Sequence, residues 1–172
     1  TTETFTDLFA DLSKLYSRTN TEVSVGALVL SGSAPSYSAS GSAISSTTQP
    51  VYISAWTSAT AVLVVPADTN ATFHVADGNG TLLPDAVLAG NSTGFTTTVN
   101  LSGVSTTTYP ALSLVANLST SDGNVTPAVE SWELSYTNGP IPLANVPITL
   151  VGSKTVGSTS GGAPIYKTTI AT

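Results

Sequence analysis

The chain has 172 residues, of which 8% are charged and 41% are hydrophobic, and its formal net charge at pH 7 is −6. Soluble domains usually carry about 25% charged residues, so hydroxyls, amides or sugars must wet most of this surface. The four basic residues, Lys14, Arg18, Lys154 and Lys167, are scattered along an acidic chain, which argues against nucleic acid as a partner.

The sequence also indicates where the protein resides. It contains no cysteine and no methionine, and no apolar run is long enough to span a bilayer. It begins at Thr1 rather than at methionine, from which we expect that a leader was removed. We therefore expect an extracellular protein of the cell surface without a membrane span.

Helical spacing occurs once, near the N-terminus. Apolar residues recur there at steps of three and four: Phe5, Leu8, Phe9, Leu12, Leu15 and Tyr16. Thr4 and Asp7 precede most of this stripe and could cap a first turn. The pattern predicts one short N-terminal helix, which either covers an end of the fold or docks a partner.

From Glu22 onward the apolar period becomes two, with turn signals at roughly ten-residue intervals. This all-β pattern predicts eight strands near residues 22–30, 37–46, 50–56, 60–66, 70–76, 94–101, 110–119 and 128–137. Turn chemistry such as Asp77-Gly78 and Asp122-Gly123 separates several of them. Eight strands of this length predict a jelly-roll-like β-sandwich over residues 1–138.

Residues 139–172 are predicted to be a C-terminal β extension or a partial stalk module. Asn138-Gly139-Pro140 interrupts the last sandwich strand, and two further strand patterns follow near 146–151 and 165–170. Two strands cannot bury a core alone. The extension must therefore pack on the sandwich, belong to a longer module, or pair with another chain.

Six asparagines begin an Asn-x-Ser/Thr triplet without proline, which is the acceptor pattern for covalent N-glycans. They are Asn70, Asn79, Asn91, Asn100, Asn117 and Asn124. Because Asn70, Asn100 and Asn117 fall on the polar phase of alternating runs, their side chains are expected to point away from the core. We predict all six as glycosylation sites.

Several segments carry a resemblance to known families. They are Gly41-Ser42-Ala43-Ile44, Phe73-His74-Val75-Ala76-Asp77-Gly78, Tyr109-Pro110-Ala111-Leu112 and Pro127-Ala128-Val129-Glu130-Ser131-Trp132. This spacing resembles galactose-binding-like jelly rolls of surface and carbohydrate-binding proteins. The stretch from Asn145 to Lys154 is similar to the opening of a transthyretin-like repeat, as in stalks of prokaryotic surface proteins. The resemblance implies a surface module followed by the start of a stalk.

No set of residues favours an enzyme. His74, the single histidine, falls on the outer phase of its strand and is expected to be an exposed bystander. Asp77, Asp85 and Asp122 lie in loop segments where a structural calcium ion is a weak alternative to simple turns, although the EF-hand pattern fails. We predict no cofactor and no dedicated metal site.

Aromatic residues suggest a sugar-binding alternative. Tyr37, Tyr52 and Trp56 are the candidates for an exposed stacking patch, whereas Trp132 and Tyr136 share one strand face and are expected in the core.

The leading hypothesis is a structural subunit of an extracellular glycosylated filament, pilus-like thread or surface stalk. Its copies would form a homopolymer by exchanging β-strands. The predicted interface residues are Val146, Ile148, Leu150, Ile165 and Ile170, and the N-terminal segment 1–12 is the other candidate donor. The alternative is a carbohydrate-binding module of a secreted enzyme or adhesin.

Overall fold

The structure, a computed structural model, describes residues 1–140 and 150–171, with side chains described over 1–140 and 155–167. Contacts divide the chain into two units, Thr1–Pro140 (unit 1) and Ile141–Thr172 (unit 2). The division lies two residues beyond the predicted domain boundary at 138.

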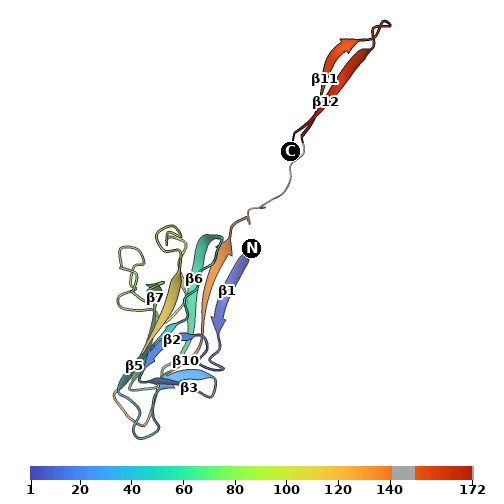
Figure 1. The fold of residues 1–172 in the computed structure, drawn as a ribbon. Coiled ribbons are helices and arrows are strands. Elements are labelled where there is room, and N and C mark those ends of the chain that lie inside the picture. Colours follow the sequence, from blue (N-terminus) through green and yellow to red (C-terminus); the bar gives the residue numbers. More distant parts are fainter. Residues whose placement is uncertain (141–149, 172) are drawn as a thin grey trace. The chain divides into compact units, whose positions relative to one another are not determined.

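Unit 1 consists of two antiparallel sheets (Figure 1). The first has the order β3-β4-β10-β6-β8, with β1 also paired to β10. Its strands are β1 (Thr2–Asp7), β3 (Thr21–Ser24), β4 (Ala27–Leu30), β6 (Ile53–Val64), β8 (Val99–Asn100) and β10 (Ala128–Asn138). The second has the order β2-β5-β9-β7. Its strands are β2 (Leu15–Thr19), β5 (Ser40–Ser45), β7 (Thr69–Asp77) and β9 (Leu112–Thr120).

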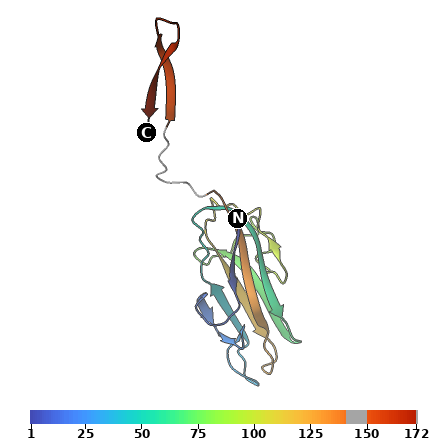
Figure 2. The ribbon, with the colours of Figure 1, turned by 90° about the vertical axis from the view of Figure 1, so that its right-hand side faces the viewer.

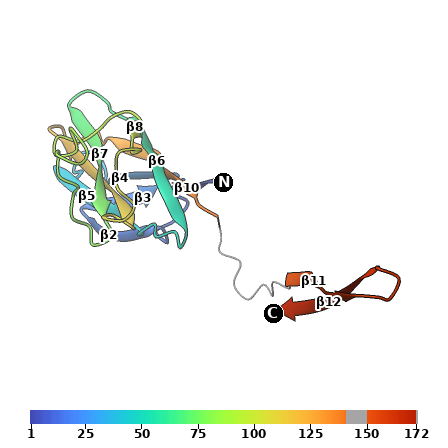
Figure 3. The same ribbon diagram turned by 90° about the horizontal axis from the view of Figure 1, so that it is seen from above.

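One hydrophobic core joins the two sheets. Trp56, Trp132 and Leu134 enter it from the first sheet, and Phe73 and Leu114 enter it from the second, each at most 1% exposed. β5 and β7 accordingly form the layer opposite β6 and β10 (Figure 3). The prediction of an all-β sandwich is confirmed at this level, since antiparallel sheets pack face to face over a shared core.

β10 is the central strand of the first sheet. It pairs with β6 along its length, and on its other side with β4 at residues 128–129 and with β1 at residues 132–137 (Figure 2). Its inward residues Trp132 and Leu134 are fully buried. This position confirms that Trp132 belongs to a core stripe rather than to an exposed platform.

The predicted N-terminal helix is wrong. Residues 2–7 form β1, which pairs with β10 over six residues, and residues 15–19 form β2. The β-branched Thr2, Thr4 and Thr6 alternate with the residues between them, a period of two that suits a strand. The main-chain ladder to β10 therefore outweighs the helical spacing of the apolar residues.

The apolar stripe itself is not a single face. Phe9 is fully buried and its ring lies 5.2 Å from that of Trp132, whereas Leu8, Leu12 and Tyr16 are exposed. Asp7 does not cap a helix; its Oδ1 accepts a hydrogen bond from the Phe9 N–H in a tight turn after β1.

Other strand boundaries also differ from the prediction. The predicted strands 50–56 and 60–66 are replaced by one strand, β6 (Ile53–Val64), in which a β-bulge at the pairing with Ser135 and Tyr136 shifts the strand phase. The segment 22–30 is instead a hairpin of β3 and β4, whose turn residues Val25 and Gly26 have positive φ.

Unit 2 is a two-stranded antiparallel hairpin. β11 (Leu150–Ser158) pairs with β12 (Pro164–Ala171) from Leu150↔Ala171 to Ser158↔Pro164, with a β-bulge between Thr155 and Gly157. Within the described residues, the two strands pair only with each other. Separately, none of the elements described is a helix with the length and apolarity needed to cross a membrane.

The strand assignment of the N-terminus predicts unequal roles for adjacent residues. Phe9→Ala should lower the free energy of unfolding by about 3–5 kcal/mol, because it opens a cavity against Trp132. Leu8→Ala, the matched control, should change it by less than about 0.5 kcal/mol, because Leu8 is 65% exposed. Urea unfolding of both variants measures the difference, and equal losses would contradict the assignment.

Candidate functional site

Five of the six predicted glycan acceptors are exposed. Asn70 and Asn117 lie on strands β7 and β9, Asn100 lies on β8, and Asn79 and Asn124 lie in loops. These five residues are exposed at the surface of unit 1, as a covalent glycan requires.

Two of these triplets lie directly opposite each other. In the β7–β9 ladder, Asn70 pairs with Ser119 and Thr72 pairs with Asn117, so each asparagine faces the hydroxyl residue of the other triplet. Both asparagines lie on the outer face of the second sheet, since their neighbours Ala71 and Leu118 are buried in the core.

A hollow of about 380 Å³ is lined by both Asn70 and Asn117. Its other lining residues come from β2, β5, β9 and the turn after β2, and most have hydroxyl or amide side chains: Thr19, Asn20, Ser40, Gly41, Ser42, Leu118 and Ser119. Such groups donate and accept hydrogen bonds without charge, which suits sugar hydroxyls.

The sixth predicted acceptor, Asn91, is corrected by the structure. Its side chain is 0% exposed, and Nδ2 donates to the carbonyls of Val75 and Leu83, each at 2.8 Å. Its Oδ1 accepts from the Val75 N–H at 2.8 Å. Asn91 therefore anchors the segment after β7 to that strand, and the folded unit has no room for a glycan there.

His74 is not the exposed bystander that we predicted. It does lie on the outer face of β7, but it is only 3% exposed because the segment containing Asn91 and Gly94 covers it. Its Nδ1 donates to the Asn91 carbonyl at 2.6 Å, and Nε2 lies 2.9 Å from Asn117 Nδ2, which donates to it. Gly94 has a φ of 91°, and a Cβ there would lie 2.7 Å from the imidazole. The ring is a structural link between this segment and the sheet.

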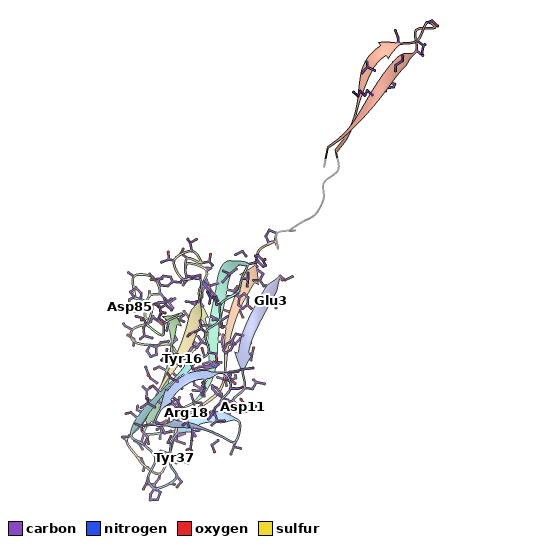
Figure 4. The ribbon with its side chains drawn as sticks, viewed as in Figure 1. Glu3, Asp11, Tyr16, Arg18, Tyr37 and Asp85 are labelled. Atoms are coloured by element: carbon purple, nitrogen blue, oxygen red, sulfur yellow. The ribbon has the colours of Figure 1, made fainter. Side chains whose placement is uncertain are left out.

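The predicted aromatic patch does not assemble. Trp56 is 1% exposed, and its Nε1 donates to the Tyr109 carbonyl at 2.8 Å. Tyr52 lies beside Gly139 at the end of β10, whereas Tyr37 bonds to Gly123 before that strand begins. Glu3 lies on β1 beside the last part of β10, and Figure 4 shows Glu3 and Tyr37 toward opposite ends of unit 1. Tyr37 and Tyr52 are therefore far apart. The β-bulges of β6 change the strand phase and turn Trp56 into the core.

A second polar pocket, of about 310 Å³, is formed by loops around Tyr109. Its lining residues lie after β5, at and after the end of β7, and before β9: Thr47, Gln49, Asp77, Gly78, Asn79, Thr108, Tyr109, Pro110 and Ala111. Sequence reasoning did not single out this group, because the three loops are far apart in the chain. The half-buried ring of Tyr109 beside polar side chains is an arrangement that can bind a sugar.

The acidic residues considered for calcium do not gather. Asp77 Oδ1 accepts hydrogen bonds from the N–H groups of Asn79 and Thr81, and so closes its own turn. Hydrogen bonds from Ser92 lower the pKa of Asp85, and hydrogen bonds from Asn124 lower the pKa of Asp122. Among the described residues, no three acidic or histidine side chains are placed to hold a metal ion.

The predicted interface residues are only partly within the described structure. Ile165 lies on β12 and is 44% exposed. Leu150 lies on β11 and Ile170 on β12, and at these two positions only the backbone is described. Val146 and Ile148 lie outside the described residues.

Comparison of the chain with protein-family models, with curated proteins and with solved structures gives no match. The function of the chain must therefore be argued from its own residues.

The buried role of Asn91 predicts a large cost for its removal. Asn91→Ala leaves the Val75 N–H and the Leu83 carbonyl buried without partners, at about 1–3 kcal/mol for each group, whereas the Val75 carbonyl keeps its hydrogen bond from the Leu83 N–H. We expect a loss of at least about 2 kcal/mol in the free energy of unfolding, measured by urea denaturation. Asn79→Ala removes a triplet of the same kind at an exposed turn and should change stability by less than about 0.5 kcal/mol. Equal effects would show that Asn91 is not an anchor.

Proposed function

We propose that the chain is a structural subunit of an extracellular, glycosylated filament, thread or stalk, and that its copies assemble by exchanging β-strands. Unit 1 would form the body of each subunit, and the hairpin of unit 2 would supply the strand that joins it to the next. The observation that carries this proposal is that β11 and β12 pair only with each other within the described residues. An isolated two-stranded hairpin is at best marginally stable in water, so its edges favour pairing with another strand.

The strand order supports the finer interpretation of unit 1 as a jelly roll. Consecutive strands β4, β5, β6 and β7 alternate between the two sheets. β9 then returns between β5 and β7, and β10 returns between β4 and β6. This nested return is the double Greek-key pattern of jelly rolls, which occur widely as rigid bodies of surface proteins.

The surface of unit 1 supports a glycosylated exterior. Asn70, Asn79, Asn100, Asn117 and Asn124 are exposed and remain the proposed sites. Attaching a sugar to Asn117 replaces one of the two hydrogens on Nδ2, so the other can still donate to His74. Glycans there would shield an uncharged, hydroxyl-rich face from aggregation.

Assembly through the hairpin predicts that a chain with a truncated hairpin does not form filaments. Deleting residues 163–172 removes β12 and should abolish filaments of the purified protein in electron micrographs, while unit 1 keeps its cooperative unfolding. The intact mass of native material should exceed 17.3 kDa by several sugar residues. Normal polymerisation of the truncated chain would rule out donation of β12.

A carbohydrate-binding module is the second candidate, and the pocket around Tyr109 favours it. Trp56 Nε1 is bonded to the carbonyl of Tyr109, so a ligand that moves the Tyr109 loop should perturb an indole in the core. Binding would require a complete and stable monomer.

This candidate predicts a saturable change in tryptophan emission on titration with neutral disaccharides such as lactose or maltose. Tyr109→Ala should abolish the change, whereas Tyr37→Ala, at a half-buried tyrosine remote from the pocket, should preserve it. No response from the intact chain would eliminate this candidate.

A further inference from the structure

Charge is divided unevenly between the two units. Unit 1 contains all ten acidic residues and only Lys14 and Arg18 as bases, a formal net charge of −8. Unit 2 contains Lys154 and Lys167 and no acidic residue, a formal net charge of +2. These two lysines are direct cross-strand partners in the hairpin. Because like charges opposite each other weaken a β-ladder, the hairpin favours an acidic partner.

Strand β1 has a free edge. The Thr1 carbonyl accepts a hydrogen bond from the Asn138 N–H at 3.0 Å, on the side of β10. Main-chain groups alternate in direction along a strand, so Thr2, Thr4 and Thr6 turn theirs away from β10. The side chain of Lys14 donates to the Thr6 carbonyl, which agrees with this phase. No other described strand pairs with this edge of β1.

The other outer strands of unit 1 are less suited to accept a positive strand. β3 and β8 are short, at four and two residues. β2 contains the basic residue Arg18. β7 is partly covered by bridges to Leu82 and Phe95. β1 is six residues long and contains the exposed Glu3.

Strand β12 has a free edge of matching phase. The Thr159 N–H donates to the Ala163 carbonyl at 2.8 Å, so the main-chain groups of Ala163 face the β11 side. By the same alternation, Ile165 and Lys167 face β11, and Pro164, Tyr166 and Thr168 turn their main-chain groups outward.

We propose that the free edge of β12 in one copy pairs antiparallel with the free edge of β1 in a second copy. The register sets Thr2 opposite Thr168, Thr4 opposite Tyr166 and Thr6 opposite Pro164. These are the residues of both strands whose main-chain groups point away from the strand already paired with them. The inference rests on the proposed function and names the acceptor edge for its strand exchange.

The side chains agree with this register. Glu3 falls opposite Lys167, which places a carboxylate beside the paired lysines of the hairpin. Phe5, which is half-buried, falls opposite Ile165, which is 44% exposed. Pro164 has no N–H to donate and falls opposite Thr6, whose carbonyl already accepts from Lys14.

Cysteine cross-linking tests the register directly, because the chain has no cysteine of its own. Glu3 and Lys167 would form a pair without mutual main-chain hydrogen bonds, with Cα atoms about 4.5 Å apart, which a disulfide can bridge. A mixture of Glu3→Cys and Lys167→Cys chains should form a covalent dimer under mild oxidation. A mixture of Glu22→Cys and Lys167→Cys chains, with the acidic partner moved to β3, should not.

A charge exchange tests the electrostatic part. Glu3→Lys and Lys167→Glu should each weaken self-association at least about fivefold at low salt, and the double exchange should restore it to within about twofold. Glu22→Lys makes the same change of charge on β3 and should alter association less than about twofold. Sedimentation velocity measures all four variants.

The outcomes separate this inference from the proposed function. If the unmodified chain stays monomeric at all concentrations and no dimer cross-links, both are overturned. If filaments form but the Glu3 and Lys167 cysteines react no better than the Glu22 control, the acceptor edge is overturned and strand exchange stands. If a variant with both Glu3→Cys and Lys167→Cys forms its disulfide only within one chain, and the mixed single-cysteine chains form none, pairing with a second copy is overturned.

Discussion

An unpaired strand edge leaves main-chain N–H and C=O groups free to bind another strand, and this constraint governs both units of the protein. In unit 1 most of these main-chain groups are paired within the sandwich: β10 is paired on both sides, and loop residues form bridges to β7. In unit 2 the outer edges of both strands stay unpaired within the described residues, because β11 and β12 pair only with each other. The hairpin therefore brings a free edge and a positive charge, while β1 brings a free edge and an acidic side chain. The proposed assembly follows from matching the two.

Because the chain has few charged residues, the charge complementarity between the hairpin and unit 1 is a distinct feature. With so few ionic residues, two cross-strand lysines in one unit and ten carboxylates in the other form a simple complementary pattern. Elsewhere the surface relies on hydroxyl and amide groups, as in the hollow lined by Asn70 and Asn117. Glycans at exposed asparagines would extend this uncharged cover and leave the strand edges as the sites of specific contact.

Strand alternation in the sequence was sufficient to predict the all-β sandwich and the core position of Trp132, because a period of two directly reports which face is buried. It failed where tertiary contacts decide the outcome. The apolar spacing from Phe5 to Tyr16 predicted a helix, but β1 forms here because it pairs with β10, a strand more than 120 residues away in the sequence. The apparent strand phase predicts an exposed Trp56, because the β-bulges of β6, which change its phase, leave no clear mark in the sequence.

The candidate sites show the same limit. An Asn-x-Ser/Thr triplet does not distinguish Asn79, in an exposed turn, from Asn91, whose amide anchors a loop to β7. His74 lies on the outer face of the sheet as its phase indicates, but a distant segment buries it. The pocket around Tyr109 and the free edge of β1 arise from elements that only the fold brings together. Strand phase thus predicts which face a residue occupies, and not what covers that face.

The most direct test of the account is a chain trace of the native assembly by electron cryo-microscopy. The account predicts filaments in which β12 of each subunit is hydrogen-bonded to β1 of the next, with Lys167 beside Glu3. Monodisperse particles in which the hairpin has both edges exposed to solvent would contradict it.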